Sequence, residues 1–524
     1  MQKKIILKGA IIVLAASFIV RILGFFFRIY IADKLNAQGM GVYQLIISLY
    51  IMLATFATSG ITFAVSRMVA ESLANASSNS PKKILKVAVL WTILISVFVT
   101  ISLLIFANQI GNLILREPRT VESIYFIAPG IPFMAVAACF KGYFFAIRKA
   151  THPSNSSIIE QTTKMVVTFA FLSFFLHETT AISCAMVSLG MTISEITAMI
   201  YLAIVYLIKK NKTKLPQSIN KTSNKKIFSN MLKISIPIQF SSTFNAALRL
   251  IESVLIIECF KIFTQGDAAT ATSTYGIIKG MTLPLILFPT SFLQAMITIL
   301  VPELSSANAS KNERAVRIAC EKSLQLTILI GLYSSAIFFI FPNKIANLFY
   351  NNTEVGHSLK LLSLTCPLMY VQIMSTGILN AIGEQFTAMK YNILEAIIRT
   401  ILIVIFVPKG GFSAFFSIMY ITNILMFLLY LNYVFKSAAL PIAFSKLFVK
   451  PILAILIATI FSTSFHYIFN KINSGKLEIL ILSGITGIVF TILLFCFKCI
   501  SLSWFNLKNK KPTTQLTHLQ KKAS

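Results

Sequence analysis

The segment Lys8–Asp33, KGAIIVLAASFIVRILGFFFRIYIAD, is apolar enough for a membrane helix but carries Arg21 and Arg28 inside its apolar run. Because a helix turns about 100° per residue, the seven-residue spacing brings both arginines to nearly one face, roughly 10 Å apart along the axis. An arginine at bilayer depth costs about 2.5–3.5 kcal/mol on insertion scales, so this stripe needs an anionic partner or a water-filled cavity. No acidic residue occurs between Met1 and Tyr30, which favours the cavity. The alternative is that the arginines snorkel to an interface or pair with a carboxylate on a neighbouring helix.

The composition places the whole chain in a membrane. Hydrophobic residues make up 56% of the 524 residues, charged residues only 12%, and the mean hydropathy is +0.79. Apolar runs of about 20 residues recur from end to end, which predicts an all-α polytopic membrane protein. The net charge of +30 comes from basic residues in short segments between these runs, so it indicates topology and no nucleic-acid partner.

Fourteen transmembrane helices are predicted from these apolar runs. They cover residues 8–32, 42–66, 85–109, 122–147, 157–177, 181–208, 230–259, 272–301, 317–341, 356–383, 387–407, 411–436, 446–470 and 477–500. The predicted domains are a six-helix lobe (1–208), a basic linker (209–228), a second six-helix lobe (229–436), an extra helix pair (437–505) and a basic tail (506–524).

The distribution of lysine and arginine predicts the orientation. The segments on the side of the N-terminus, the long linker and the tail hold roughly 28 basic residues, and those on the other side hold roughly 9. We therefore expect both termini in the cytoplasm and the chain in the plasma membrane, which requires an even number of helices.

The two lobes show signs of an internal repeat. Residues 127–164 align with residues within 361–399 at a constant offset of 235, which suggests two homologous halves that both enter from the cytoplasm. The matching pairs are Pro132 with Pro367, Glu160 with Glu395, and Lys164 with Arg399.

Charges within the predicted helix 230–259 are candidates for a functional site. Arg249 and Glu252 lie three residues apart and could form a structural pair on one helix face. Alternatively, Arg249 joins Arg21 and Arg28 in one basic surface, and Glu252 holds Arg249 when substrate is absent.

Further intramembrane charges stand alone in their helices. Lys279 precedes Pro284 and Pro289, which should bend the helix, and it either joins the basic surface or snorkels to the interface. Glu195 is a candidate ion or proton site. Lys141 could pair with any of these acids.

Two acid–base pairs occur at helical spacing near the predicted cytoplasmic ends. Glu160 and Lys164, like Glu395 and Arg399, are four residues apart with the acid first, which is the favoured order. They are interpreted either as structural pairs or as parts of a cytoplasmic gate and coupling site.

The sequence contains no signature of catalysis. The histidines are scattered, and no phosphate-binding glycine loop, HExxH or GxSxG occurs. Cys496 and Cys499 form a lone CxxC without a second pair. We therefore predict no enzyme activity, no cofactor and no metal site.

Three stretches resemble a known family. LKGAIIVLAASFIVRILGFFFRIYIADKLNAQGMGVYQLI (7–46), FKGYFFAIRKATHPSNSSIIEQ (140–161) and VPELSSA (301–307) resemble the polysaccharide-biosynthesis branch that includes stage V sporulation protein B. This branch belongs to the multidrug/oligosaccharidyl-lipid/polysaccharide (MOP) exporter superfamily, which also contains the lipid II flippase.

The resemblance implies two lobes around a central cavity, alternating access and a lipid-linked saccharide as cargo. Arg21 and Gly24 match the flippase pattern in the first helix, whereas Arg28 lies one residue later than that pattern. The flippase also has a basic residue in its second helix, and this chain has none in residues 43–66. By resemblance, the terminal pair 446–500 forms a groove for the polyprenyl tail.

The functional hypothesis is a flippase for an undecaprenyl-diphosphate-linked saccharide, with a lipid II-like peptidoglycan precursor, for instance for the spore cortex, as the favoured cargo. The diphosphate ligands would be Arg21, Arg28 and Arg249, with Lys279 as a further candidate. A coupling cation, H⁺ or Na⁺, or the membrane potential would drive transport. The alternatives are a drug/cation antiporter of the same fold and a membrane scaffold that recruits cell-wall synthesis enzymes.

Overall fold

The computed structural model describes residues 2–74, 81–174, 179–210, 223–438, 445–469 and 477–499, and these are helical with short connections. Most of the predicted linker and all of the predicted tail lie outside the described residues.

The helices of the first half follow the predicted apolar runs. They are α1 (Gln2–Ala74), α2 (Pro81–Ile105), α3 (Ala107–Gln109), η1 (Ile110–Ile114), η2 (Pro118–Thr120), α4 (Val121–Ile127), α5 (Gly130–Ala146), α6 (Thr151–Phe174) and α7 (Thr180–Lys210).

The second half contains more breaks. Its elements are α8 (Asn224–Phe263), α9 (Ala268–Tyr275), η3 (Gly276–Thr282), α10 (Leu283–Leu287), α11 (Thr290–Ala309), α12 (Glu313–Ile340), α13 (Pro342–Phe349), α14 (Thr353–Ser363), α15 (Cys366–Ile382) and α16 (Gln385–Ser437). The chain ends with η4 (Ser445–Val449), α17 (Lys450–Phe469) and α18 (Leu477–Cys496).

Two elements each merge a predicted pair of helices across a kink. Asn36 in α1 has φ 56° and ψ −177°, and Gly411 in α16 has φ 52° and ψ −129°. Asparagine tolerates a positive φ better than most residues, and glycine has no Cβ that would oppose it. A Cβ on Gly411 would also lie 2.4 Å from the ring of Phe263, so glycine is required there for both reasons.

Prolines accompany the other breaks. The two helical stretches on either side of Phe288 and Pro289 are bent by 54°, close to where the sequence predicts a bend. Within the described residues, six helices are long and apolar enough to cross a membrane, or nine if each bent pair is one span. The chain is therefore a multi-pass helical membrane protein, and the number fourteen stays a prediction.

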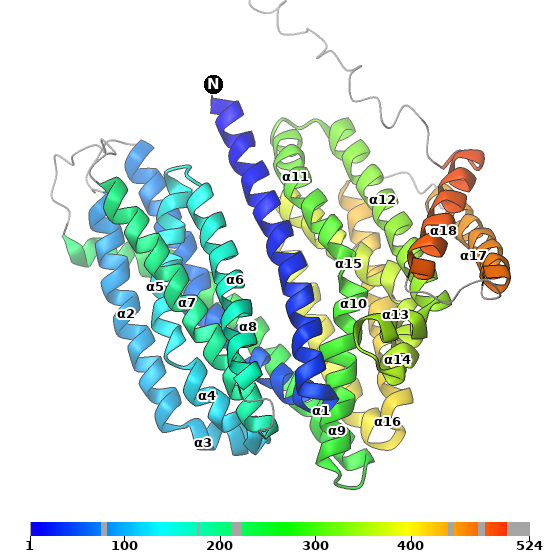
Figure 1. The fold of residues 1–524 in the computed structure, drawn as a ribbon. Coiled ribbons are helices and arrows are strands. Elements are labelled where there is room, and N and C mark those ends of the chain that lie inside the picture. Colours follow the sequence, from blue (N-terminus) through cyan, green and yellow to red (C-terminus); the bar gives the residue numbers. More distant parts are fainter. Residues whose placement is uncertain are drawn as a thin grey trace, which may run out of the picture.

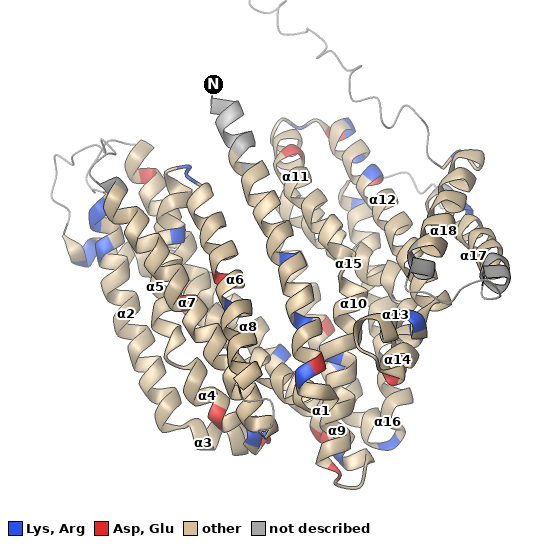
Figure 2. Cartoon of the chain, in the orientation of Figure 1, with Lys and Arg blue, Asp and Glu red and all other residues tan. Residues whose placement is uncertain are grey.

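The helices form two bundles that lie side by side, one containing α2–α7 and the other α9–α16 (Figure 1). The bundles diverge toward the end at which the N-terminus lies (Figure 1). Charged positions gather toward the ends of the bundles, and several basic ones lie on the first part of α1 (Figure 2). The predicted domain boundaries stay predictions.

Helices α1 and α8 connect the bundles. The start of α8, with Ile227 and Met231, belongs to a core cluster of the first bundle, and its end, with Phe260, belongs to a core with Phe415 of α16. The hydroxyls of Ser48 in α1 and Ser253 in α8 lie 3.1 Å apart.

The terminal pair packs against α12. Leu329 and Ala336 share a core cluster with Ala454 of α17 and Phe490 of α18. The hydroxyl of Tyr333 also donates a hydrogen bond to the carbonyl oxygen of Ser483 at 2.9 Å. The short η4 before this pair also reaches α16, where the ring of Phe448 lies 6.0 Å from that of Phe427.

Candidate functional site

The first part of α1 lies between the two bundles. The ring of Phe25 is 4.4 Å from Phe288 and 5.4 Å from Phe349, both in the second bundle. The ring of Tyr30 is 3.9 Å from Phe169 of α6 in the first bundle. The first part of α1 therefore contacts both bundles.

The predicted arginine stripe is carried by this part of α1. Arg21 is exposed and Arg28 is half-buried, and within the described residues neither forms an ion pair with a carboxylate. Arg28 interacts electrostatically with the phenols of Tyr43 and Tyr350. At Gly24, a Cβ would lie 3.8 Å from Nε2 of Gln161. The positive charge of Arg21 and Arg28 is therefore not neutralised by a carboxylate of the described residues.

A second group of predicted residues lines one cavity of about 460 Å³, which we call the charged cavity. It is bounded by α1, α8, α9, η3, α10, α15 and α16. The predicted site residues on its walls are Arg249, Glu252, Lys279, Glu395 and Arg399, accompanied by the amides of Gln44, Asn245, Gln372, Asn392 and Asn423. Arg21 and Arg28 are not among the described residues that line it. The expected grouping of Arg249 with these two arginines is therefore not formed in this conformation.

Ion pairs neutralise most of the charged cavity. Lys279 Nζ lies 3.3 Å from Glu252 Oε1, so the expected partner of Glu252, Arg249, is replaced by a lysine from η3. The predicted pair of Glu395 and Arg399 is present. Three bases face two acids, and within the described residues Arg249 is the base without an ion pair.

Polar side chains complete these contacts. Gln372 donates a hydrogen bond to Glu395, and Arg399 Nε donates one to Thr422 Oγ1 at 3.3 Å. Nε2 of Gln44 is buried without a hydrogen-bond partner among the described residues. A buried amide without a partner has unused capacity to bind a polar ligand.

The acidic residue Glu160 of the first bundle is not paired in the way that its predicted repeat equivalent Glu395 is paired in the second bundle. Glu160 Oε2 lies 3.3 Å from Lys141 Nζ, and Lys164 forms no ion pair within the described residues. The expected pair of Glu160 and Lys164 is therefore wrong in this conformation. Tyr50 of α1 donates a hydrogen bond to Glu195, and Lys164 acts electrostatically on that carboxylate.

Contacts at the end opposite the N-terminus join the bundles, and sequence analysis missed them. Arg116 Nη1 lies 3.1 Å from Glu258 Oε2, and Lys261 Nζ donates to the carbonyl oxygen of Arg116 at 3.0 Å. Thr272 Oγ1 lies 3.4 Å from Glu117 Oε2. We call these five residues the distal latch. The sequence does contain a signal for these contacts. Arg116 and Glu117 are adjacent, Glu258 and Lys261 are three residues apart, and both pairs lie at helix ends on the same predicted side of the membrane.

Glu117 is held as a carboxylate by its neighbour. Arg119 forms two hydrogen bonds with it, from Nε at 2.7 Å and Nη2 at 2.8 Å. Burial raises the pKa of Glu117, but the hydrogen bonds and charge of Arg119 outweigh it and hold the pKa below its ordinary value. The latch acceptor for Thr272 is therefore ionised near neutral pH.

These features define a class of protein, a multi-pass helical membrane protein with two bundles and charged side chains within them. A family model described as "Polysaccharide biosynthesis protein" matches residues 6–308, more than half of the chain, and a MatE model matches residues 253–405. The chain belongs to this polysaccharide biosynthesis family of the MOP exporter superfamily, in the branch of stage V sporulation protein B. The resemblance noted in the sequence is thereby confirmed.

Two curated relatives come from Bacillus subtilis (strain 168). Stage V sporulation protein B is 24% identical over 507 residues, covering 95% of this chain and 97% of the relative. Sporulation protein YkvU is 22% identical over 357 residues, covering 68% and 78%.

Solved structures share the fold. The lipid II flippase MurJ in an inward closed conformation has a TM-score of 0.68 at 17% identity, covering 93% of this chain and 98% of that one. A MATE family transporter of the MOP superfamily in an inward-facing conformation has a TM-score of 0.62 at 12% identity, covering 82% and 98%.

Proposed function

We propose that this protein is a flippase that moves an undecaprenyl-diphosphate-linked saccharide from the inner to the outer leaflet of the plasma membrane by alternating access. The favoured cargo is a lipid II-like peptidoglycan precursor. The observation that carries the proposal is the arginine stripe, because Arg21 and Arg28 lie on a helix between the bundles and form no ion pair with any carboxylate in the described part of the chain. Unpaired guanidinium groups at membrane depth are expensive unless an anion or water meets them.

A diphosphate suits these side chains chemically. Guanidinium groups form paired hydrogen bonds with phosphate oxygens, and the bonds are strengthened by the opposite charges. Arg21 is the more exposed of the two and would make the first contact. Arg249 would join it from the charged cavity when the bundles rotate, while Lys279 serves to neutralise Glu252.

Movement of the lobes 1–208 and 229–436 would carry the head group across. The distal latch closes the end opposite the N-terminus, and the bundles diverge at the other end. With both termini in the cytoplasm, this conformation would accept cargo from the inner leaflet. Arg116 and Glu258 would separate when the protein opens outward.

Buried carboxylates would couple the movement to a cation, H⁺ or Na⁺. Glu195, held by Tyr50, and Glu160, paired with Lys141, lie in the first bundle. Glu252, paired with Lys279, and Glu395, paired with Arg399, would serve the same purpose in the second. Exchange of these partners during transport would change the charge that the cavities present to the cargo.

A drug/cation antiporter of the same superfamily is the second candidate, and the match of residues 253–405 to the MatE model favours it. Such a transporter needs a carboxylate for its cationic cargo. The carboxylates of Glu160, Glu195, Glu252 and Glu395 are engaged with lysine, arginine or tyrosine. Within the described residues, Arg21 and Arg249 form no ion pair with a carboxylate. The charge distribution therefore favours an anionic cargo.

Reconstitution tests the proposal. Purified protein in liposomes that contain a labelled undecaprenyl-diphosphate saccharide should move the lipid between leaflets, with and without imposed ion gradients. The variant Arg21→Ala/Arg249→Ala should slow this movement by about tenfold or more, since both charge-assisted contacts are lost. Arg67→Ala, which removes an exposed arginine of the same helix α1, is the matched control.

Two outcomes would contradict the proposal. Full movement by the double variant would remove the arginines from the mechanism. No movement by folded wild-type protein would favour the alternative of a scaffold for cell-wall synthesis enzymes.

A further inference from the structure

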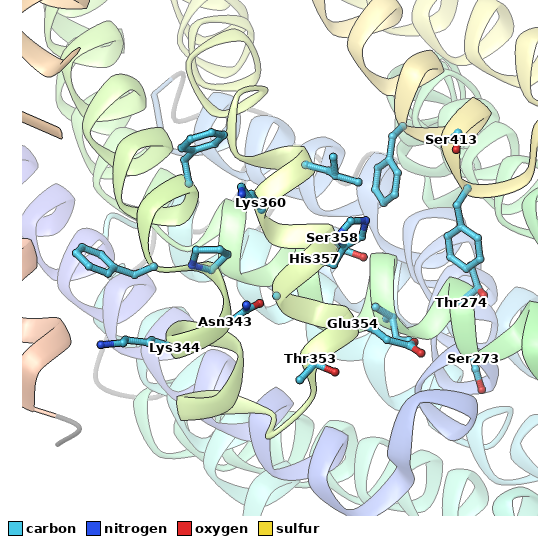
Figure 3. A pocket seen from close by; sticks show the side chains of 18 of the residues that line it. Ser273, Thr274, Asn343, Lys344, Thr353, Glu354, His357, Ser358, Lys360 and Ser413 are labelled. Carbon is cyan, nitrogen blue, oxygen red and sulfur yellow. The ribbon is translucent and has the colours of Figure 1, made fainter. Parts of the chain in front are cut away.

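A cavity of about 1420 Å³ lies in the second bundle, away from the arginine stripe, and the proposed transport mechanism does not use it. We call it the distal cavity. Its walls come from α9 and η3, from the corner between α12 and α13, from α14, and from α16 beyond its kink (Figure 3).

Backbone features build this space. The kink at Gly411 redirects α16, and the residues that follow it line the cavity. A Cβ on Gly356 would lie 3.0 Å from the Cα of Asn343, so α13 and α14 pack closely at this point. The cavity is therefore a product of specific residues in two separate parts of the chain.

One wall of the distal cavity is charged. Glu354, His357 and Lys360 lie three residues apart along α14, which places them along one side of the helix, and all three are exposed. Lys344 of α13 lines the same space, and Lys360 Nζ lies 5.4 Å from the centre of the Phe339 ring. The charged and basic side chains that line the cavity are therefore Lys344, His357, Lys360 and Glu354 (Figure 3).

The wall formed by α16 is aromatic and hydroxylated. Phe412, Phe416 and Tyr420 follow each other at four-residue spacing, and Ser413 and Ser417 form a second stripe beside them. Aromatic faces offer flat apolar surfaces to the C–H groups of a sugar ring, and hydroxyls and charged groups bind its polar edge. This combination of walls is suited to a sugar that carries a negative charge.

The distal cavity adjoins the charged cavity along shared elements. Thr274 faces the distal cavity, and Tyr275 and Lys279, in the same stretch of α9 and η3, face the charged cavity. On α16, Tyr420 lines the first and Asn423 the second. A ligand in the distal cavity therefore touches the same helical turns that position the ion pairs.

We propose that the distal cavity is a second binding site, for a saccharide that carries a carboxylate or phosphate group. The saccharide could belong to the head group of the flipped lipid or to a free glycan on the outer side. The first of these sources depends on the proposed function. The binding itself does not, because it requires no transport.

Binding to the full chain in nanodiscs, measured by calorimetry, tests this inference. The ligands are N-acetylmuramic acid as the anionic sugar, N-acetylglucosamine as the neutral one, inorganic phosphate, and a short-chain polyprenyl-diphosphate N-acetylmuramic acid derivative. We expect the anionic sugar to bind at least tenfold more tightly than the neutral one. His357→Gln/Lys360→Gln should reduce this affinity at least tenfold.

Lys409→Gln is the matched control, because it removes an exposed positive charge beside the α16 kink without touching the cavity wall. Its affinity should equal that of the wild type. Tighter binding of the lipid-linked ligand than of the free sugar, lost in the double variant, identifies cargo as the source, and equal binding identifies free glycan.

Three results would overturn the inference. The first is that folded protein, with an unchanged thermal unfolding profile, shows no saturable binding of the anionic sugar. The second is equal affinity for the neutral and the anionic sugar, and the third is full displacement of the sugar by inorganic phosphate at a similar concentration. A protein that flips lipid but shows any of these results keeps its proposed function and loses this site. A protein that binds the sugar but moves no lipid keeps this binding site and loses its proposed function as a flippase.

Discussion

At the residue scale, the position of a charge in the sequence is a poor guide to its partner. Arg249 and Glu252 share a helix face, yet the carboxylate of Glu252 contacts Lys279 on η3 at 3.3 Å. Glu160 likewise contacts Lys141 instead of Lys164. Arg21 and Arg249, to which the proposed function assigns a ligand, are among the basic residues without a carboxylate partner in the described part of the chain, as are Arg28 and Lys164.

The pair of Lys279 and Glu252 can be tested for a structural role. Lys279→Met leaves a carboxylate that is only 8% exposed without its nearest base. The loss of stability is expected to approach about 3–5 kcal/mol, lessened by the charges of Arg399 and Arg249, which also act on Glu252. Adding Glu252→Gln should recover a large part of this loss in denaturant or thermal unfolding.

Transport measurements on the same variants separate two roles of Lys279. If the lysine only neutralises Glu252, the double variant should flip lipid at close to the wild-type rate. A double variant that is stable but inactive would return Lys279 to the substrate-binding residues.

At the scale of the element, breaks in helices decide where cavities form. Helix α16 changes direction at Gly411, and residues from Phe412 onward then line the distal cavity. Helix α1 changes direction at Asn36, which lets its first part lie between the bundles while its second part packs against α8. Without these breaks, both helices would run straight and the cavities would lose a wall.

The kink in α16 gives a prediction for Gly411→Ala. The positive φ disfavours any side chain by about 1–3 kcal/mol, and the added methyl group would meet the ring of Phe263 at 2.4 Å. We expect a loss of stability of at least this size in thermal unfolding. Gly484→Ala, where a Cβ meets nothing within 4 Å, is the control and should change stability little by comparison. Equal unfolding temperatures for the two variants would contradict the requirement for glycine.

At the scale of the whole molecule, few polar contacts hold the bundles together at the distal end. The latch consists of one ion pair between Arg116 and Glu258, a lysine hydrogen bond and one hydroxyl contact. Exposed ion pairs contribute about 0–1 kcal/mol each, so these contacts add little to the stability of the closed arrangement. Elsewhere α1 and α8 contact each other through the hydroxyls of Ser48 and Ser253 and through the close approach of Gly60 to the backbone of Ser235.

The latch predicts the effect of Glu258→Gln on the conformational equilibrium. Removing the carboxylate should raise the population of the outward-open form by roughly two- to fivefold, which corresponds to an ion pair of this strength. Spin labels at the exposed positions Gln109 and Gln265 report the distance between the two bundle ends. Lys409→Gln, also at an exposed position, should leave the distance distribution unchanged. An unchanged distribution in Glu258→Gln would exclude the ion pair from the closure.

The sequence by itself determined the membrane class, the approximate helices, the family and the arginine stripe. These depend on local quantities, which are hydropathy over about 20 residues, the angle per residue in a helix, and short stretches that resemble a known family. It also located five residues that the structure gathers into the charged cavity, because charge inside an apolar run is rare and visible.

The tertiary structure decided which charges pair, where the bundles close and that α14 and α16 enclose the distal cavity. Lys279 reaches Glu252, and Arg116 reaches Glu258, only after helices far apart in the chain have packed at a particular rotation and depth. The rotation of each helix depends on the kinks and on close contacts such as that of Gly60 with the backbone of Ser235. The partner in such a contact cannot be predicted from a local sequence pattern. Local periodicity sets the face of a helix on which a side chain lies, and packing sets what that face meets.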